Sequence, residues 1–372
     1  MPKKKAPRKE SAEAIMERAS LAVGKRFKGA LSERASTALA FPSVWFSTGS
    51  LVLDRLCAGK NPGGVPGGRV VHIPGRWSTG KSILLDHIAR SCIRQGGLAC
   101  ISETEGSRDP HFANAIGLDL KKVELQRPAT VEEMIDHGLE WHDSIRKQDT
   151  MIPLVWGIDS LDSTEAGRAA KEGLSEGGGW RYGGGKSEAL AAGLRKVVQR
   201  CARYPTTLVM LNQTRIDPLV TYGSKERSSG GNPPHFYASL EVQLHTSPLG
   251  DVRGDYKGNL PSEQMRKRLG LRDKEKGGIV GRWVRAKIVK TKVGMTLFQE
   301  ADFYIDFRKG ISAWLGLLQQ MIREGKANIK DSGEVTFRIE EGEILDFENT
   351  SAWMRWLADN PKYLLPYPEE TQ

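Results

Sequence analysis

The sequence predicts an α/β protein built on a mainly parallel, twisted sheet, and three observations support this prediction. Short apolar runs alternate with longer helical patterns from Phe46 onward, which is the order typical of parallel sheets. The stretch GRWSTGKS at residues 75–82 fits the phosphate-binding pattern G-x-x-x-x-G-K-[ST]. Polar residues follow several predicted strands, and in such a sheet the carboxyl ends of the strands meet at one edge, where ligands bind.

The composition favours an acidic polymer as partner. The chain has 372 residues, a formal net charge of +10 and a pI near 9.3, although the segment PKKKAPRK supplies five of the positive charges. Its four cysteines are scattered without C-x-x-C spacing, which is typical of a reducing compartment. No apolar run reaches the length of a membrane span, and no signal-peptide pattern appears. We therefore expect a cytoplasmic protein without a membrane partner.

Residues 75–82 form the clearest motif, and we refer to them as the phosphate loop. A β-branched run precedes them and a helical pattern follows, as the motif requires; a chance glycine loop would need neither flank. Lys81 is expected to reach the outer phosphates of a nucleotide, and the Ser82 hydroxyl to ligate Mg²⁺. The expected cradle consists of Gly75, Arg76, Trp77, Ser78, Thr79, Gly80, Lys81 and Ser82.

Acidic and amide side chains follow three further strands. Asp159 ends PLVWGID, where a carboxylate can hold Mg²⁺ directly or through water, or alternatively cap a turn. Glu103 and Glu105 follow LACIS, and either could polarise an attacking water, so the pattern leaves this choice open. Gln213 ends TTLVMLNQ, where its amide can contact a γ-phosphate and move the loop that follows.

Two long, glycine-rich loops continue from the strands that end at Asp159 and Gln213. The first, residues 166–188, contains Trp180, Arg181 and Tyr182, a combination that suits stacking on unpaired bases, although a docked surface tryptophan is the alternative. The second covers residues 214–232. Loops of this length are usually functional or disordered. Because both loops begin beside nucleotide contacts, nucleotide state can be coupled to polymer binding.

The chain is expected to have four parts. Residues 1–10 form a basic, disordered tail, and residues 11–45 a short amphipathic helix with a linker. That helix cannot bury its apolar stripe alone, so it either folds back or docks on a neighbouring subunit. Residues 46–308 form the core, in which SLEVQLH, GRWVRAKIVKTK and FQEADFYIDF are expected to be later, antiparallel strands that extend the sheet. Residues 309–372 form a small α+β domain with a hairpin and a Trp-rich helix.

The order and wording of these pieces resemble the RecA-type recombinases, in a divergent bacterial or phage-encoded branch. The blocks that carry the resemblance are STGSLVLD, the phosphate loop, ETEGSRDP, GIDS, NQTR, GGN with FYAS, and KIVKTK. The resemblance implies a RecA-like P-loop NTPase core with ATP and Mg²⁺ as cofactors. It also implies that the N-terminal helix is an oligomerisation element that docks on a neighbouring core.

The resemblance further implies roles for individual residues. It identifies Glu105 as the catalytic glutamate and Gln213 as the γ-phosphate sensor. It matches Asp109 and Phe112 to adenine contacts. It has Lys290 and Lys292 reach the ATP of the adjacent protomer, like an arginine finger supplied in trans. DNA contacts are implied, besides the aromatic loop, at Arg195, Arg215, Tyr222, Gly230, Gly231 and Asn232.

The function implied is that of an ATP-dependent DNA recombinase. Such a protein forms helical filaments on single-stranded DNA and pairs it with homologous double-stranded DNA in repair, in the bacterial nucleoid or a phage host's cytoplasm. Single-strand-binding and mediator proteins are the further expected partners. The alternatives are a ring helicase, a recombinase paralogue or mediator, and a clock-like signalling ATPase. No primase-binding or zinc domain is visible, and the complete set of nucleotide residues argues against a mediator.

Some positions depart from the family pattern. Arg76 and Trp77 stand where the bacterial family usually has Pro and an acidic residue, and Trp77 could alter nucleotide affinity or pack against a neighbour. Asp217 and Pro218 occupy a stretch of the second loop that is usually basic and then aliphatic. The basic segment 257–278 has no assigned counterpart.

Overall fold

The structure is a computed structural model, and it describes the greater part of the chain. The described residues are 11–26, 44–59, 63–106, 108–149, 151–167, 184–216, 226–253, 279–293, 299–330, 332–339, 343–360 and 363. The chain divides into two compact units, residues 1–43 and 44–372. The first contains α1 (Ala12–Arg26), where the Ser11 hydroxyl accepts a hydrogen bond from the Ala14 N–H at 3.3 Å, as expected of an N-cap. The side chains of Ile15, Met16 and Leu21 in α1 are 54–60% exposed.

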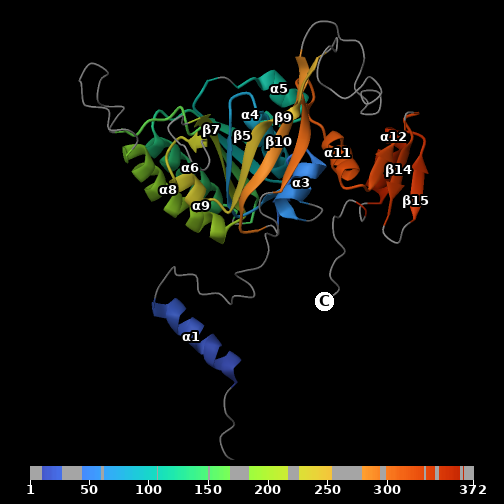
Figure 1. The fold of residues 1–372 in the computed structure, drawn as a ribbon. Helices are drawn as coiled ribbons and strands as arrows, with labels where there is room; N and C mark the ends of the chain where they lie inside the picture. Colours follow the sequence, from blue (N-terminus) through green and yellow to red (C-terminus); the bar gives the residue numbers. More distant parts are fainter. Residues whose placement is uncertain are drawn as a thin grey trace, which may run out of the picture. The chain divides into compact units, whose positions relative to one another are not determined.

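The second unit is organised around a ten-stranded sheet with the order β12-β11-β10-β9-β3-β7-β6-β4-β5, and β8 pairs with β7 (Figure 1). The pairs from β9 to β5 are parallel, whereas β10, β11 and β12 add antiparallel strands at one edge. The strands are β3 (Val70–Gly75), β4 (Leu98–Glu103), β5 (Val123–Gln126), β6 (Leu154–Asp159), β7 (Thr206–Ile216), β8 (Glu226–Ser228), β9 (Leu240–Arg253), β10 (Ile279–Thr291), β11 (Glu300–Asp306) and β12 (Gly310–Ile311).

The predicted α/β class with a mainly parallel sheet is confirmed, with one correction. The segment SLEVQLH in β9 was expected to be antiparallel. It pairs in parallel with β3 and antiparallel with β10, so the change of direction comes one strand later than expected. The reason is that the chain crosses over between β8 and β9 through α9 (Pro233–Tyr237). This crossover brings the start of β9 beside the start of β3, where the Ser239 N–H donates to the Val70 carbonyl.

Helices cover both faces of this sheet. One apolar cluster contains residues of α3 (Leu51–Ala58), α4 (Lys81–Arg94) and α11 (Leu315–Arg323), and a second contains residues of α6 (Val131–Arg146) and α8 (Gly184–Arg203). Figure 1 shows α6 and α8 on one side of the sheet and α3 and α11 on the other.

Two side chains cap the start of α6. The Thr130 hydroxyl accepts from the Glu133 N–H at 3.2 Å, and the Glu133 carboxylate accepts from the Ala129 N–H, one residue before the N-cap. Smaller elements are α5 (Pro110–Ala115), η1 (Leu120–Lys122), β1 (Trp45–Phe46) and β2 (Val65–Pro66).

The C-terminal part forms a second sheet. β13 (Ala327–Ile329), β14 (Val335–Arg338) and β15 (Ile344–Phe347) pair antiparallel, and α12 (Thr350–Asp359) follows them. The expected hairpin and Trp-rich helix are therefore present. Trp353 of α12 is fully buried and lies 6.0 Å from Phe337 between ring centroids. Residues of this sheet and of the large sheet belong to one apolar cluster.

His87 connects α4 to the edge strand β12. The ring is 2% exposed, and its Nε2 accepts a hydrogen bond from the Ile311 N–H at 3.0 Å. A Cβ atom added at Gly49 or Gly310, both with positive φ, would lie 2.3 Å or 2.5 Å from the ring nitrogens. An Nε2 that accepts must be unprotonated, and burial lowers the pKa of His87 to about 4. The folded protein therefore holds this histidine neutral.

We expect the protein to lose stability as the pH falls from about 6.5 to about 4. In this window the unfolded imidazole binds a proton that the folded one does not, so the free energy of unfolding decreases, by at most about 3 kcal/mol. Urea unfolding at several pH values measures this. His87→Gln should retain an acceptor and flatten the pH dependence in that window. An unchanged slope in the variant would show that other groups cause it.

Candidate functional site

The phosphate loop turns the chain from the buried strand β3 into α4. Gly80 is the N-cap of α4 and has φ 77°, and Ser78 has φ 58°, the one positive value among the described non-glycine residues. The Thr79 hydroxyl donates to the Arg76 carbonyl at 2.8 Å. Gly75 has no room for a side chain, because a Cβ would lie 2.9 Å from the carbonyl oxygen of Leu244. The loop is therefore tightly wound, as the motif requires.

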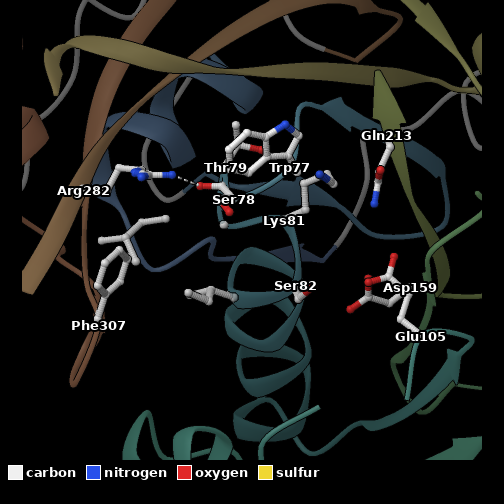
Figure 2. Close-up of a pocket in the computed structure, with 13 residues that line it drawn as sticks. Trp77, Ser78, Thr79, Lys81, Ser82, Glu105, Asp159, Gln213, Arg282 and Phe307 are labelled. Carbon is white, nitrogen blue, oxygen red and sulfur yellow. Dashed lines mark hydrogen bonds between the residues drawn. The ribbon is translucent and has the colours of Figure 1, made fainter. Parts of the chain in front are cut away.

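A cavity of about 510 Å³ opens above this loop. The sequence-predicted residues that line it are Trp77, Ser78, Thr79, Gly80, Lys81, Ser82, Glu105, Asp159 and Gln213. Four separate strand ends thus contribute, because β3, β4, β6 and β7 are parallel neighbours whose carboxyl ends share one edge. In Figure 2, Gln213, Asp159 and Glu105 lie on one side of Lys81, and Arg282 and Phe307 lie on the other.

Lys81 is held at the centre of the cavity by backbone oxygens. Its Nζ donates to the carbonyls of Gly75 and Arg76 at 3.0 and 2.8 Å. Burial lowers the pKa of Lys81, and the negative charges of Asp159, Glu105 and Asp162 oppose this effect. The ammonium is therefore a partly buried cation whose charge an incoming anion would stabilise.

Asp159 and Ser82 supply the oxygen atoms that suit a magnesium ion. Asp159 is 8% exposed, burial raises its pKa, and a hydrogen bond from the Ser82 hydroxyl and the charge of Arg108 oppose the rise. Arg108 lies 3.5 Å from Asp159 and also pairs with Asp86 of α4. The described residues include no group of three or more acidic, histidine or cysteine ligands. Mg²⁺ in nucleotide sites needs only one or two protein oxygens beside phosphates and water, so these residues fit it.

The two candidate glutamates differ in their surroundings. Glu105 lines the cavity, and its Oε1 accepts a hydrogen bond from the Ser160 hydroxyl at 2.8 Å. Glu103 ends β4, is 3% exposed and lies 3.7 Å from Arg127 in an ion pair. Of the two carboxylates, Glu105 lines the cavity and Glu103 does not, a difference that the sequence pattern alone left open.

Gln213 is fixed by its neighbours in the sheet. It lies opposite Gly75 in the parallel β3–β7 pair, and its backbone N–H donates to the Asp162 carboxylate at 2.7 Å. Asp162 lies between β6 and the first long loop, and Gln213 directly precedes the second. One hydrogen bond therefore links the stems of both loops beside the cavity.

Lys290 and Lys292 lie at the end of β10 and do not line this cavity. The Lys290 ammonium donates to the carbonyls of His235 and Phe236 in α9 at 2.6 and 2.9 Å. Lys292 is exposed, and its backbone N–H donates to the Ser239 carbonyl. Burial lowers the pKa of Lys290, with a further lowering from the charge of Lys292. The two cations stand together on a surface that their own nucleotide cavity does not use.

The RecA N-terminal domain family matches residues 15–260, more than half of the chain. This chain belongs to the RecA family. Curated relatives named Protein RecA include that of Rubrobacter xylanophilus, 34% identical over 295 residues (79% of this chain and 74% of the relative). Those of Helicobacter pylori and a Thermotoga species are 29% and 27% identical, and cover 79% and 96% of this chain and 82% and 90% of the relatives.

In this RecA-family chain, several residues expected to contact DNA gather where α8 and α9 pack together. Arg195 of α8 donates to the Tyr237 hydroxyl at 3.1 Å. Gly230 and Gly231, with φ 78° and 71°, lead into Asn232, the N-cap of α9. Arg215 is exposed on β7. The remaining expected contacts lie outside the described residues: Trp180, Arg181, Tyr182 and Tyr222.

Lys186 ties the stems of the two loops together. Its ammonium donates to the carbonyls of Thr164 and Asp162 at 2.6 and 3.3 Å, and to the Ser229 hydroxyl at 3.4 Å. Thr164 precedes the first loop's undescribed part, and Ser229 follows that of the second. Burial lowers the pKa of Lys186, and nearby carboxylates oppose this.

The structure also separates two expected residues from the cavity and adds others. Asp109 caps α5, where its carboxylate accepts from the His111 N–H at 2.8 Å, and Phe112 packs on a neighbouring apolar cluster; neither lines the cavity. Their role in holding adenine stays a prediction. The lining residues that sequence reasoning missed are Ile83, Arg282, Ile305 and Phe307. An antiparallel pairing of β10 with β11 could have been predicted from the sequence, and it places Arg282 opposite Ile305. It does not predict that Arg282 contacts the phosphate loop.

Among the described helices, none combines the length and the apolar character that crossing a membrane requires. The described cysteines are all buried, and they form no disulfide bonds.

Proposed function

We propose that this RecA-family recombinase is a DNA-dependent ATPase that forms helical filaments on single-stranded DNA and catalyses homologous pairing and strand exchange. One observation carries the proposal. The cavity that combines Lys81, Ser82, Asp159, Glu105 and Gln213 adjoins the stems of both long loops, through the Asp162 contact to Gln213 and the Lys186 contacts. The nucleotide site and the two candidate DNA-binding loops then share the carboxyl ends of the same strands.

ATP would bind with its phosphates on the loop N–H groups and on Lys81. The helix N-terminus at Gly80 favours negative charge, and the Lys81 ammonium would exchange its carbonyl partners for phosphate oxygens. Ser82 and Asp159 would hold Mg²⁺, which neutralises phosphate charge when it is bound. Glu105, oriented by Ser160, would hold the attacking water in line with the γ-phosphate and accept its proton.

Nucleotide state would reach DNA through Gln213. An amide that gains or loses a γ-phosphate contact moves β7, and β7 leads directly into the second loop. The Lys186 bridge would carry the same movement to the first loop. The net charge of +10 suits a partner with a phosphate backbone.

Lys290 and Lys292 would act on the ATP of the adjacent protomer. Neither lysine lines its own cavity, and Lys292 is exposed just beyond β10, which supports action in trans, as with the arginine finger of other phosphoryl-transfer systems. In this arrangement hydrolysis depends on filament assembly, and α1, with its exposed apolar side chains, would dock on a neighbouring core.

We expect single-stranded DNA to stimulate ATP hydrolysis. Steady-state hydrolysis with and without long polythymidine, at two salt concentrations, measures this. Stimulation should weaken at the higher salt, because bound lysines and arginines displace counterions from the phosphates. Electron microscopy of the same samples separates helical filaments from the rings of a helicase. Hydrolysis that is indifferent to DNA would instead favour a mediator or signalling ATPase.

We expect Glu105→Gln to lower kcat by about 100-fold, the contribution of one positioned base, and to retain ATP-dependent DNA binding. Glu103→Gln is the matched control. It removes the same charge from a side chain that lies two residues earlier in the sequence and does not line the cavity. The control should keep kcat within a few-fold. Equal losses in both variants would contradict the assignment of Glu105.

We expect mixed filaments to rescue two inactive variants. The Lys81→Ala variant lacks a working cavity but keeps Lys290 and Lys292. The double variant Lys290→Ala, Lys292→Ala keeps the cavity and lacks these two lysines. If the lysines act across the interface, an equal mixture regains about a quarter of the wild-type rate, since random neighbours complete one site in four. A double-lysine variant that hydrolyses at the wild-type rate alone would rule out action in trans.

A further inference from the structure

Arg282 is a cation in the nucleotide cavity that none of the motifs includes. It lies on β10, and its guanidinium group uses three nitrogens for three contacts. Figure 2 shows the contact to Ser78. Nη1 donates to the Ser78 carbonyl at 2.7 Å. Nε and Nη2 donate to the two carboxylate oxygens of Asp251 at 2.5 and 3.0 Å. The residue thus connects the phosphate loop to the β9–β10 pair.

The contact falls on the most constrained residue of the phosphate loop. Ser78 has a left-handed backbone at φ 58°, a conformation that costs free energy in a residue with a side chain. The surroundings must compensate for that cost if the loop is to stay wound without a ligand. A hydrogen bond from a charged donor is about twice as strong as a neutral one, so the bond from Arg282 has the required strength.

Asp251 sets the position of the guanidinium. It lies directly opposite Arg282 in the antiparallel β9–β10 register, so the pair is local to two adjacent strands. The two-pronged contact holds the guanidinium plane and leaves Nη1 aimed at the loop. The hydrogen bonds that Arg282 donates to Asp251 raise the pKa of Arg282, which stays charged. Because Asp251 balances that charge, Arg282 contributes little net field to the cavity.

We propose that Arg282, oriented by Asp251, is a positioning residue that holds Ser78 and the phosphate loop in the wound conformation that binds nucleoside polyphosphates. The inference rests on the nucleotide-binding part of the proposed function. It concerns the affinity for ATP and ADP alike, since the loop cradles the phosphates that both share. It does not concern the hydrolytic step, whose residues lie on the other side of Lys81 (Figure 2).

The test measures the Kd of fluorescent ATP and ADP analogues with Mg²⁺ and without DNA. Arg282→Ala should raise both Kd values about tenfold, as expected for the loss of one charge-assisted hydrogen bond. The kcat at saturating ATP with DNA should change less than twofold. Arg282→Lys should restore most of the affinity, because an ammonium can still donate to the Ser78 carbonyl. The ratio of variant to wild-type Kd should not depend on salt.

A double-mutant cycle separates this role from a general effect on the strands. Asp251→Asn should weaken binding in the wild-type background and have no further effect beside Arg282→Ala, because Asp251 acts through Arg282. Arg285→Ala is the matched control: it removes another Arg–Asp pair on β10, with Asp302, away from the cavity. It should leave both Kd values unchanged, and thermal melting identifies any variant that has lost its fold.

Three outcomes would overturn the inference: an Arg282→Ala variant that binds within twofold of wild type, additive losses in the cycle, or a loss of affinity that disappears at high salt. If Arg282→Ala does not fold, Arg282→Lys and Asp251→Asn decide the matter by the same criteria. A wild-type protein that binds neither analogue would contradict the proposed function itself, which distinguishes the two failures.

Discussion

The site depends on the burial of β3 at the centre of the sheet. All six residues of this strand are buried, and β3 lies between β9 and β7. The backbone of β3 is therefore accessible to a ligand only where the strand ends. There the backbone turns at once into α4, and the close approach of Leu244 and Thr79 to Gly75 excludes a side chain at the turn. The N–H groups of such a turn have no carbonyl partners within the chain, so a bound anion can accept their hydrogen bonds.

Charge is distributed unequally across the cavity, and this inequality favours a metal-bound polyphosphate over a simple anion. Asp159 and Glu105 lie to one side of Lys81, where burial raises the pKa of Asp159 and so disfavours its charged form. A divalent cation between these carboxylates and the phosphates relieves that cost, whereas a bare phosphate would increase it. Arg108 pairs with both Asp86 and Asp159, and its positive charge already compensates part of the cost of the Asp159 charge.

The parts of the site that depend on local sequence could be predicted, and those that depend on tertiary packing could not. The phosphate loop begins at the end of β3, Asp159 ends β6, and Gln213 lies near the end of β7, so a parallel sheet places them at the same edge whatever its strand order. The choice between Glu103 and Glu105 depended on which way the chain turns after β4, which no local pattern encodes. Arg282 and Phe307 reach the cavity only because β10 and β11 extend the sheet beyond β9, and no motif includes either residue. The direction of β9 was mispredicted for a similar reason, since short apolar strands look alike in parallel and antiparallel pairs.

The β10 strand gives a physical reason to connect neighbouring nucleotide sites. Arg282 contacts its own phosphate loop, and Lys290 lies eight positions further along, about 26 Å at the usual rise of a strand. The register with β9 shifts immediately after Arg282 and immediately before Lys290. Such irregularities turn a strand locally and redirect the side chains beside them, which places both cations off the regular alternation of the sheet. The segment between them is paired on both edges, with β9 and β11, and is therefore stiff. If Arg282 holds one loop and Lys290 reaches the next protomer's ATP, a tilt of this strand moves both contacts together, so the two sites would respond as one unit.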